Sequence, residues 1–212
     1  MSYLEIKKSA FIASAEDWGL PKGYTKLSYL QSSTEKEWFD TGIASTSEIV
    51  IQCKVSAEGA TGDYKAVCWG ETSTLSERTA LYIDKSSQYV AIRNTSKLSP
   101  IGTSSGINDP HEFELTNTTV TMDGVSHTIN SSNGSYSSSR SLYIFGINSS
   151  TRIKTNKGDD GLMRIYWLKI YNGTTLVRDY IPCLNASGTP CFFDRVSQSD
   201  CLNVGSGTLT YE

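Results

Sequence analysis

Apolar and polar residues alternate with a period of two along much of the chain, and no window beyond residue 20 carries the 3.6-residue apolar period of an amphipathic helix. In the stretch IVIQCKVSA, every second residue from Ile49 to Val55 is apolar, whereas Gln52, Lys54 and Ser56 are polar. Side chains of a strand point alternately to its two faces, so this pattern predicts a strand with one buried face.

Turn signals separate such stretches at short intervals. The segment HEFELTNTTVTMDGVSHTIN (111–130) predicts strands on both sides of Asp123-Gly124, because this dipeptide tolerates the positive φ values of a two-residue hairpin turn. The segment TALYIDKSSQYVAIRN (79–94) predicts two strands around a turn at 84–87. Regularly spaced hairpins without helices are typical of an antiparallel sandwich.

The segment RIYWLKIYNGTTLVRDYIPC (164–183) predicts a further hairpin, with its turn at Asn172-Gly173. In strict alternation Ile165 and Trp167 face one way and Leu168 and Ile170 the other, which is typical of a central strand covered on both faces. The returning strand is expected to stop at Pro182, because proline cannot donate to a ladder.

The Ser-rich tract 130–141 is expected to be a surface loop inside one domain rather than a linker, because predicted strands flank it. We therefore predict an all-β fold, a two-sheet antiparallel jelly-roll sandwich over residues 20–212. Residues 1–19 form a separate N-terminal extension in this prediction.

Composition narrows the function classes. The net charge of −3 and the lack of a Lys/Arg run argue against a nucleic-acid partner. No stretch approaches the ~20 apolar residues of a membrane span, and the N-terminus lacks the apolar core of a secretory signal. Five cysteines without a CxxC pair are expected to be free thiols, with a disulfide among Cys183, Cys191 and Cys201 as the alternative.

Two ends of the chain resemble a known family. LPKGYTKLSYLQSSTEKEWFDTGI (20–43) resembles the opening, and RIYWLKIYNGTTLVRDYIPCLNASGTPCFFDRVSQSDCLNVGSGTLT (164–210) the close, of LamG-like domains. These belong to the concanavalin A-like lectin–glucanase superfamily and are found in phage virion and gut-bacterial surface proteins. The resemblance implies a concanavalin A-like jelly roll and leaves the activity open, since this fold carries lectins, glycanases and structural modules alike.

From the resemblance we expect a non-catalytic structural or attachment module of a bacteriophage particle, in a head decoration or a tail fibre, with glycan binding as an open option. The expected location is the virion, after synthesis in the bacterial cytoplasm, and the expected partners are other virion proteins, copies of itself or a cell-surface glycan. The alternatives are a lectin-like module of a bacterial surface protein and a degenerate glycanase.

Carboxylates offer the first candidates for catalysis. Glycanases of this fold pair two acidic residues across a cleft, and the nearest match is Glu112 and Glu114, without the middle carboxylate of that motif. A polar strand face explains this pair, and a solvated loop is expected to explain Glu35, Glu37 and Asp40. We therefore expect no enzyme activity.

Other motifs also favour structural roles. The segment GTSSG (102–106) matches a nucleophile elbow in letters only, because a strand rather than a helix is predicted after it. His111 and His127 lack a nucleophile to pair with, and His127 is expected to be structural. No cofactor motif is present, and Asp159 and Asp160 are a weak calcium candidate in what is expected to be an ordinary turn.

Aromatic residues supply the material for sugar binding, but Trp69, Tyr82, Tyr89 and Tyr136 are expected to pack in the core or at its edge, so no glycan site is predicted. The N-terminal segment is rich in large apolar groups, and such patches mark contact surfaces. It is expected either to wrap its own sandwich as an edge strand or to dock on a neighbouring subunit. The residues of this assembly contact are Tyr3, Leu4, Ile6, Phe11, Ile12 and Trp18.

Overall fold

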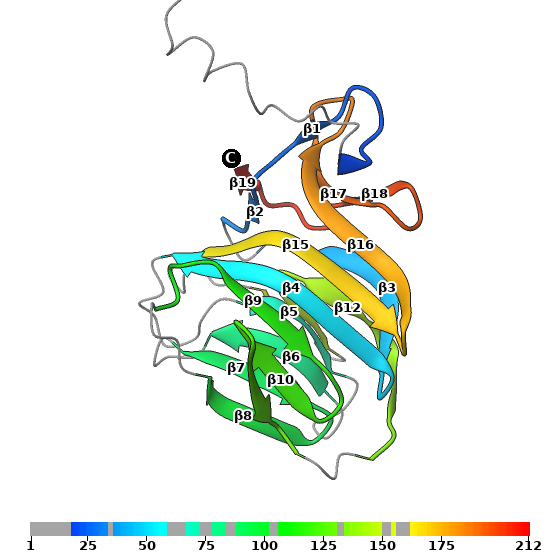
Figure 1. The fold of residues 1–212 in the computed structure, drawn as a ribbon. Helices are drawn as coiled ribbons and strands as arrows, with labels where there is room; N and C mark the ends of the chain where they lie inside the picture. Colours follow the sequence, from blue (N-terminus) through cyan, green and yellow to red (C-terminus); the bar gives the residue numbers. More distant parts are fainter. Residues whose placement is uncertain are drawn as a thin grey trace, which may run out of the picture.

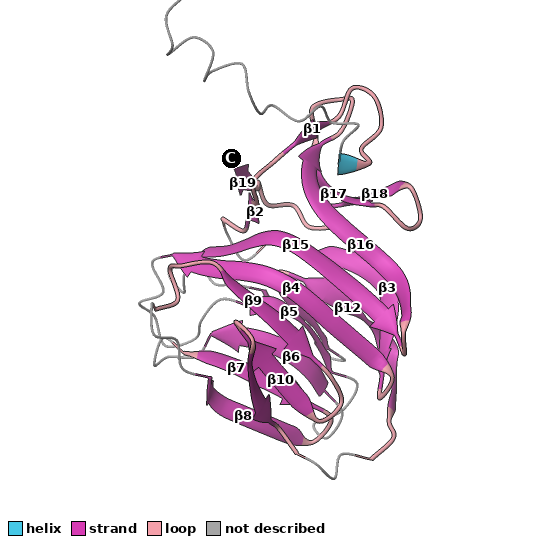
Figure 2. Ribbon diagram, in the orientation of Figure 1, coloured by secondary structure: helices cyan, strands magenta, loops and turns pink. Residues whose placement is uncertain are grey.

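The computed structural model describes residues 18–33, 36–58, 67–72, 78–83, 88–101, 106–130, 134–149, 154–155 and 162–212. In these ranges strands joined by turns form two stacked sheets (Figure 1), with one short helical turn at Trp18 (Figure 2). The predicted all-β, two-sheet sandwich of the jelly-roll type is confirmed. The boundary predicted between residues 19 and 20 stays a prediction.

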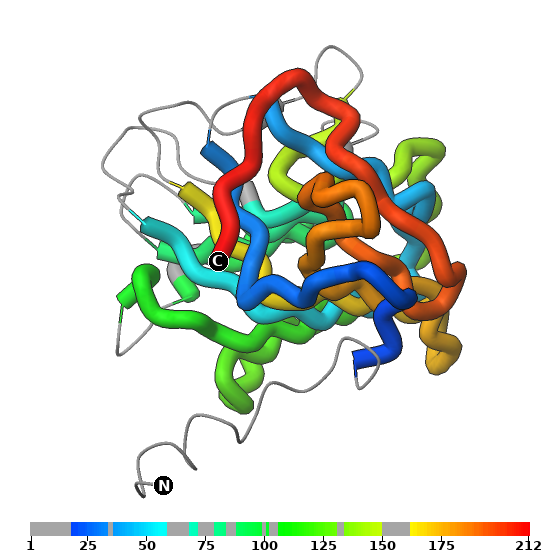
Figure 3. Tube along the Cα trace, turned by 90° about the horizontal axis from the view of Figure 1, so that it is seen from above, coloured from blue at the N-terminus to red at the C-terminus, as the bar shows by residue number. Residues whose placement is uncertain are grey.

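The larger sheet contains eleven strands in the described ranges. Its main path runs β11 (Val125–Thr128), β10 (Thr119–Met122), β9 (His111–Leu115), β4 (Ile49–Glu58), β15 (Leu162–Asn172), β16 (Thr175–Leu184), β17 (Pro190–Asp194) and β18 (Ser199–Leu202). Short strands extend it, with β1 (Thr25–Lys26) on β16, and β2 (Leu30–Gln31) between β15 and β19 (Thr210–Tyr211). The red C-terminal segment therefore runs beside the blue N-terminal one in Figure 3.

The smaller sheet contains eight strands in the same part of the chain. Its path runs β14 (Lys154–Thr155), β13 (Gly146–Ser149), β5 (Val67–Thr72), β6 (Arg78–Ile83), β7 (Tyr89–Arg93) and β8 (Ser96–Ile101), and β12 (Ser137–Ile144) pairs with both β3 (Phe39–Thr46) and β5. The pairing of β5 with β13 is parallel, and the other described pairings are antiparallel.

The core lies between the two sheets and follows the predicted alternation. Ile51, Cys53 and Val55 of β4 are buried, and the side chains between them are half-buried. Phe39, Phe145 and Phe192 pack in the centre in tilted and edge-to-face contacts, with ring centroids 4.9 Å apart for Phe39 and Phe192. Each large apolar side chain removed from water contributes about 1.5–3 kcal/mol, so this layer is the main stabilising feature of the fold.

The predicted hairpins are confirmed in the described residues. Strands β6 and β7 pair antiparallel, and the turn at 84–87 lies outside the described residues. Strands β10 and β11 pair around Asp123 and Gly124, whose φ values are 49° and 81°. Two consecutive positive φ values are the geometry of a type I′ turn, as the Asp-Gly dipeptide predicted.

The prediction that β15 is apolar on both faces is wrong. A β-bulge lies between Ile165 and Trp167, where Ile165 pairs with Val55 and Trp167 with Lys54. The extra residue resets the alternation, so that Ile165, Leu168 and Ile170 are all buried on the core face. Trp167 is on the outer face with Lys54, although β15 is central, as predicted, between β4 and β16.

Two details of the β15–β16 hairpin also differ from the prediction. Asn172 pairs with Thr175, so the two-residue loop is Gly173-Thr174 rather than Asn172-Gly173, with Gly173 at φ 58° in the first loop position. Strand β16 continues through Pro182, which pairs with Phe192. The Pro182 carbonyl points away from β17 and accepts a hydrogen bond from the Leu27 N–H. In a strand, the N–H and C=O of one residue point to the same side, so the N–H that proline lacks would also point away from β17, and no β16–β17 hydrogen bond is lost.

The Ser-rich tract is not only a loop, because its second half, from Ser137, is part of β12. Buried hydroxyl contacts hold it in place. The Tyr136 hydroxyl lies 2.9 Å from Ser45 Oγ and 2.7 Å from Thr79 Oγ1, and Ser138 Oγ donates to Glu71 Oε2 at 2.7 Å. These polar partners stabilise the Ser-rich half of the strand, whereas Leu142 and Ile144 of its second half are buried in the core. Residues 131–133 lie outside the described residues.

Candidate functional site

Glu112 and Glu114 share the outer face of β9, as the polar-face interpretation predicted. Glu112 Oε1 forms an ion pair with Lys54 Nζ at 3.4 Å, and Glu114 Oε2 accepts a hydrogen bond from Gln52 Nε2 at 2.7 Å. Both carboxylates therefore already have a partner on β4.

The second carboxylate group does not form a solvated loop. Glu37 is fully buried, with Ser33 Oγ donating to its Oε1 at 3.2 Å, so that part of the prediction is wrong. A charged group accepts burial where hydrogen bonds replace water. Asp40 is exposed, but it belongs to β3 and accepts from the Gly42 N–H, whereas Glu35 lies outside the described residues.

The histidines have structural surroundings. His111 is buried, with Nδ1 2.6 Å from Asp123 Oδ2 and Nε2 2.7 Å from the Gly106 carbonyl oxygen, whereas His127 is half-buried on β11. Partial burial of the Asp123 carboxylate by itself raises its pKa, but the hydrogen bonds from the Glu112 backbone N–H and the His111 imidazole outweigh this and hold the pKa below its usual value. After Gly106 the chain turns into β9 and not into a helix, as predicted; residues 102–105 lie outside the described residues.

Several candidates fall outside the described residues, namely Tyr3, Leu4, Ile6, Phe11 and Ile12 of the N-terminal segment and Asp159 and Asp160 of the calcium candidate. Trp18 is 40% exposed, with Lys26 Nζ 3.4 Å from its ring centroid. In the described ranges, no three His, Cys, Asp or Glu side chains converge as metal ligands. Nor does any described helix have the length and apolar character needed to cross a membrane.

The aromatic residues considered from sequence are mostly core residues. Trp69, Tyr89 and Tyr136 are buried, as the packing interpretation predicted, and Tyr82 is half-buried on the outer face of the smaller sheet. These four are therefore not brought together into a binding surface.

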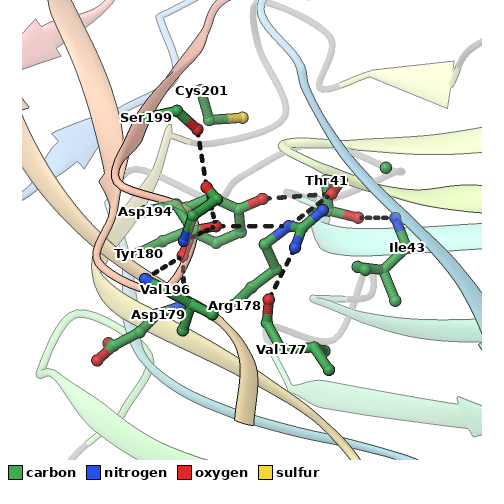
Figure 4. A network of polar contacts seen from close by, with 12 residues as sticks. Thr41, Ile43, Val177, Arg178, Asp179, Tyr180, Asp194, Val196, Ser199 and Cys201 are labelled. Carbon is green, nitrogen blue, oxygen red and sulfur yellow. Dashed lines mark hydrogen bonds and ion pairs between the residues drawn. The ribbon is translucent and has the colours of Figure 1, made fainter.

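A polar cleft of about 410 Å³ lies where β3 of the smaller sheet meets β16, β17 and β18 of the larger one (Figure 4). Asp194 lies at its centre and is almost completely buried. Its Oδ1 accepts from the backbone N–H groups of Asp179 (2.9 Å) and Val196 (3.1 Å), and its Oδ2 accepts from Ser197 Oγ (2.6 Å). Asp194 thus fixes the turn between β17 and β18.

Arg178 connects the two sheets in the same cleft. Its Nε donates to the Thr41 carbonyl oxygen at 3.1 Å and lies 3.6 Å from Asp194 Oδ2, and its Nη1 donates to the Val177 carbonyl oxygen at 2.8 Å. The Tyr180 hydroxyl donates to the same Thr41 oxygen, and burial raises the pKa of the Cys201 thiol to about 12. Most donors and acceptors of the cleft are therefore used within the protein, and the thiol is not an activated nucleophile.

The outer face of β15 carries a different kind of surface. Trp167, Lys169 and Tyr171 pair with Lys54, Gln52 and Val50 of β4, so their side chains share the solvent-facing side of the larger sheet. Four half-buried aromatic side chains lie around β15 on this face and are called the aromatic row below: Tyr29, Tyr166, Trp167 and Tyr171.

Neighbouring groups orient Tyr29, Tyr166 and Trp167 of the aromatic row. The Tyr29 and Tyr166 rings meet edge to face with centroids 5.6 Å apart, and the Arg164 guanidinium lies 4.7 Å from the Tyr29 centroid. Tyr166 Oη is 3.2 Å from Ser56 Oγ, and Lys169 Nζ is 5.8 Å from the Trp167 centroid. Such contacts lower the side-chain entropy that a ligand would otherwise have to remove.

A shallow groove of about 280 Å³ lies at the other end of the aromatic row, next to Tyr171. The hydrogen-bonded pair Gln52–Glu114 forms its polar wall, and it also includes Val50, Thr116, Gly173 and Thr174. An aromatic face beside an oriented amide and carboxylate is a suitable surface for a ligand with both C–H faces and hydroxyl groups.

Sequence reasoning missed the aromatic row, because it placed Trp167 in the core on the assumption of unbroken alternation. The signal that could have found it is the sequence Trp-Leu-Lys-Ile-Tyr from 167 to 171. It alternates large amphipathic residues with aliphatic ones, which is the pattern of one exposed and one buried face.

No known family profile and no curated protein matches the chain. Among solved structures, the chain is similar to a mutant of Trypanosoma rangeli sialidase displaying trans-sialidase activity, with 15% identity and a TM-score of 0.39. The similarity covers 58% of this chain and 20% of the other. A likeness this weak carries no argument about activity.

Proposed function

We propose that this protein is a non-catalytic attachment module that binds a glycan along the outer face of β15. The observation that carries the proposal is the aromatic row, four half-buried rings on one solvent-facing side of a central strand. Sugar rings stack their C–H faces on aromatic side chains, and their hydroxyls bond to amide and carboxylate groups of the Gln52–Glu114 kind.

The dimensions of the face favour an oligosaccharide over a single sugar. Trp167 and Tyr171 are four residues apart on one strand, which corresponds to about 13 Å at the usual rise per residue. Charge favours a ligand without strong charge, because Lys54 is paired with Glu112, and Arg164 with Glu58.

A non-catalytic role is supported by the carboxylates on this face. Glu112 forms an ion pair with Lys54, and Glu114 accepts a hydrogen bond from Gln52, so both carboxylates are engaged with β4. The setting in a bacteriophage particle, and membership of the LamG-like group, rest on the resemblance of residues 20–43 and 164–210 alone.

The glycan proposal is tested by a glycan array followed by titration of the best ligand. Trp167→Ala and Tyr171→Ala are each expected to weaken binding by about tenfold, the upper part of the 0.5–1.5 kcal/mol typical of an aromatic contact. The matched control is Tyr143→Ala, a half-buried tyrosine on the outer face of the smaller sheet, which should leave the affinity unchanged. Equal losses in all three variants would contradict the assigned face.

Two further measurements separate the alternatives. Release of reducing sugars from the bound glycan is expected to be undetectable, and turnover that depends on Glu112 or Glu114 would support the glycanase alternative instead. Mass spectrometry of purified virions is expected to find the chain in the particle, whereas detection only in a cell envelope would favour a bacterial surface module.

A further inference from the structure

A pair of thiols lies on the outer face of the larger sheet, in a small cluster separate from the main core. Cys183 of β16 and Cys191 of β17 are directly opposite each other, and their Sγ atoms are 3.5 Å apart. Both are fully buried, although both are free thiols in this structure.

A small second core surrounds the pair. It contains Leu20, Ile181, Cys183, Cys191 and Phe193, with Tyr24 packed against it. Leu20 and Tyr24 come from the segment before β1, and the Tyr24 hydroxyl donates to Asp200 Oδ1 at 2.9 Å. This segment therefore forms a cover over the two sulfur atoms.

The geometry selects this pair from the three cysteines near the C-terminus. Cys201 pairs with Phe192, which belongs to the main core, so its side chain is on the opposite face of the sheet from Cys191. Directly opposite residues of an antiparallel pair have Cα atoms about 4.5–5.5 Å apart, within the range of about 4.4–6.8 Å that a disulfide spans.

We propose that Cys183 and Cys191 are a reversible oxidation site, at which a cross-strand disulfide joins β16 to β17. The oxidant is a small-molecule disulfide. One protein thiolate attacks it and releases one small thiolate, and the second protein thiolate then attacks the protein sulfur of the mixed disulfide and releases the other. The two protons lost by the protein thiols end on the two small thiols, so the exchange balances.

The cover controls the rate of this exchange. The neighbouring Cys183 thiol and burial raise the pKa of Cys191, so few thiolates exist while Leu20 and Tyr24 are in place. Oxidation of the folded chain is expected to be slow and to proceed through opening of residues 18–24. The proposal is independent of glycan binding, since the aromatic row contains none of these residues.

The test is incubation of the folded full-length chain with oxidised glutathione, followed by intact-mass measurement and peptide mapping without reduction. We expect the loss of two hydrogens, an internal disulfide between Cys183 and Cys191 in the tryptic peptide 179–195, restoration by dithiothreitol, and a higher midpoint of thermal unfolding for the oxidised form. The Cys201→Ser variant is expected to behave like the wild type, and Cys183→Ser to lose the link.

Leu20→Ala, which thins the cover, is expected to speed the oxidation several-fold. Peptide mapping of the oxidised wild-type chain tests the proposal even if a variant fails to fold. A link through Cys201, a link that forms only in denaturant, or full alkylation of all five cysteines after oxidation of both wild type and Leu20→Ala would each overturn the proposal.

Discussion

The polar cleft around Asp194 and Arg178 and the aromatic row both contain many polar and aromatic side chains, but these side chains have different roles in the two regions. In the cleft, the carboxylate of Asp194 accepts hydrogen bonds from backbone N–H groups, and the guanidinium of Arg178 donates to backbone carbonyl groups. The Arg178 bond to Thr41 holds the two sheets together. Along β15, Trp167 and Tyr171 present their rings to solvent. Polar density alone therefore does not mark a binding site, and what matters is which groups remain available to a ligand.

The largest effect on stability is expected at the centre of the cleft. Asp194→Ala leaves the backbone N–H groups of Asp179 and Val196 without their acceptor and Arg178 without its counter-charge. The free energy of unfolding should fall by about 3 kcal/mol or more, as when one member of a buried charged pair is removed. Denaturant titration measures it. A loss no larger than that of a surface substitution would show that the cleft is not a structural link.

The aromatic row should give the opposite result. Trp167→Ala combined with Tyr171→Ala is expected to abolish measurable glycan binding, because two stacking surfaces are lost together, while the free energy of unfolding changes by about 1 kcal/mol or less per site. Binding and unfolding titrations on the same sample check this. If the double variant unfolds before its binding can be measured, Trp167→Phe and Tyr171→Phe, which keep a ring, provide the control.

The third prediction concerns Asp123, in the turn of the β10–β11 hairpin, whose contribution to the free energy of unfolding depends on pH. The pKa of Asp123 is lowered in the folded state from its ordinary 3.8, so its stabilising contribution is present above that value and is lost as the pH falls through the folded-state pKa. Asp123→Asn keeps a residue that tolerates positive φ but loses the charge beside His111. We expect a loss smaller than that of Asp194→Ala at neutral pH and a flatter acid limb. Unfolding titrations across the acid range measure both.

The smallest effect is expected for the exposed ion pair on the outer face. Lys54 and Glu112 have side chains that are 35% and 59% exposed, and such pairs contribute about 0–1 kcal/mol. Glu112→Gln should change the free energy of unfolding by less than about 0.5 kcal/mol. It should also leave glycan affinity within a factor of two, roughly the scale of that energy. A large loss of affinity would move Glu112 into the binding surface.

The sequence predicted those parts of the structure that depend only on residues close together in the chain. The Asp123-Gly124 turn depends on two residues that tolerate positive φ, and the buried face of β4 depends on alternation within one strand, so both were predictable. The bulge before Trp167 depends on the partner strand, because it becomes visible only when Ile165 and Trp167 are matched with Val55 and Lys54.

The same distinction explains the candidate sites. Arg178 and Thr41 are 137 positions apart, and nothing near either residue announces their contact. The burial of Glu37 likewise depends on the packing of the chain around it, which its polar neighbours in EKEWFD concealed. Trp167 and Tyr171 were in view but were assigned to the wrong face, and that error follows from the bulge alone.

The pairing of distant strands has a consequence for how the chain acquires its structure. Strand β2, near residue 30, pairs with β15, near residue 165, and with β19, near residue 210, whereas β4 pairs with β9 and β15. Synthesis must therefore reach residue 115 before β9 can pair with β4, and residue 172 before β15 can complete the pairing on the other edge of β4. Proteins dominated by such distant pairings fold slowly, on the scale of milliseconds to seconds. Until β9 and then β15 are made, β4, with its row of apolar residues, has unpaired edges that can associate with other chains.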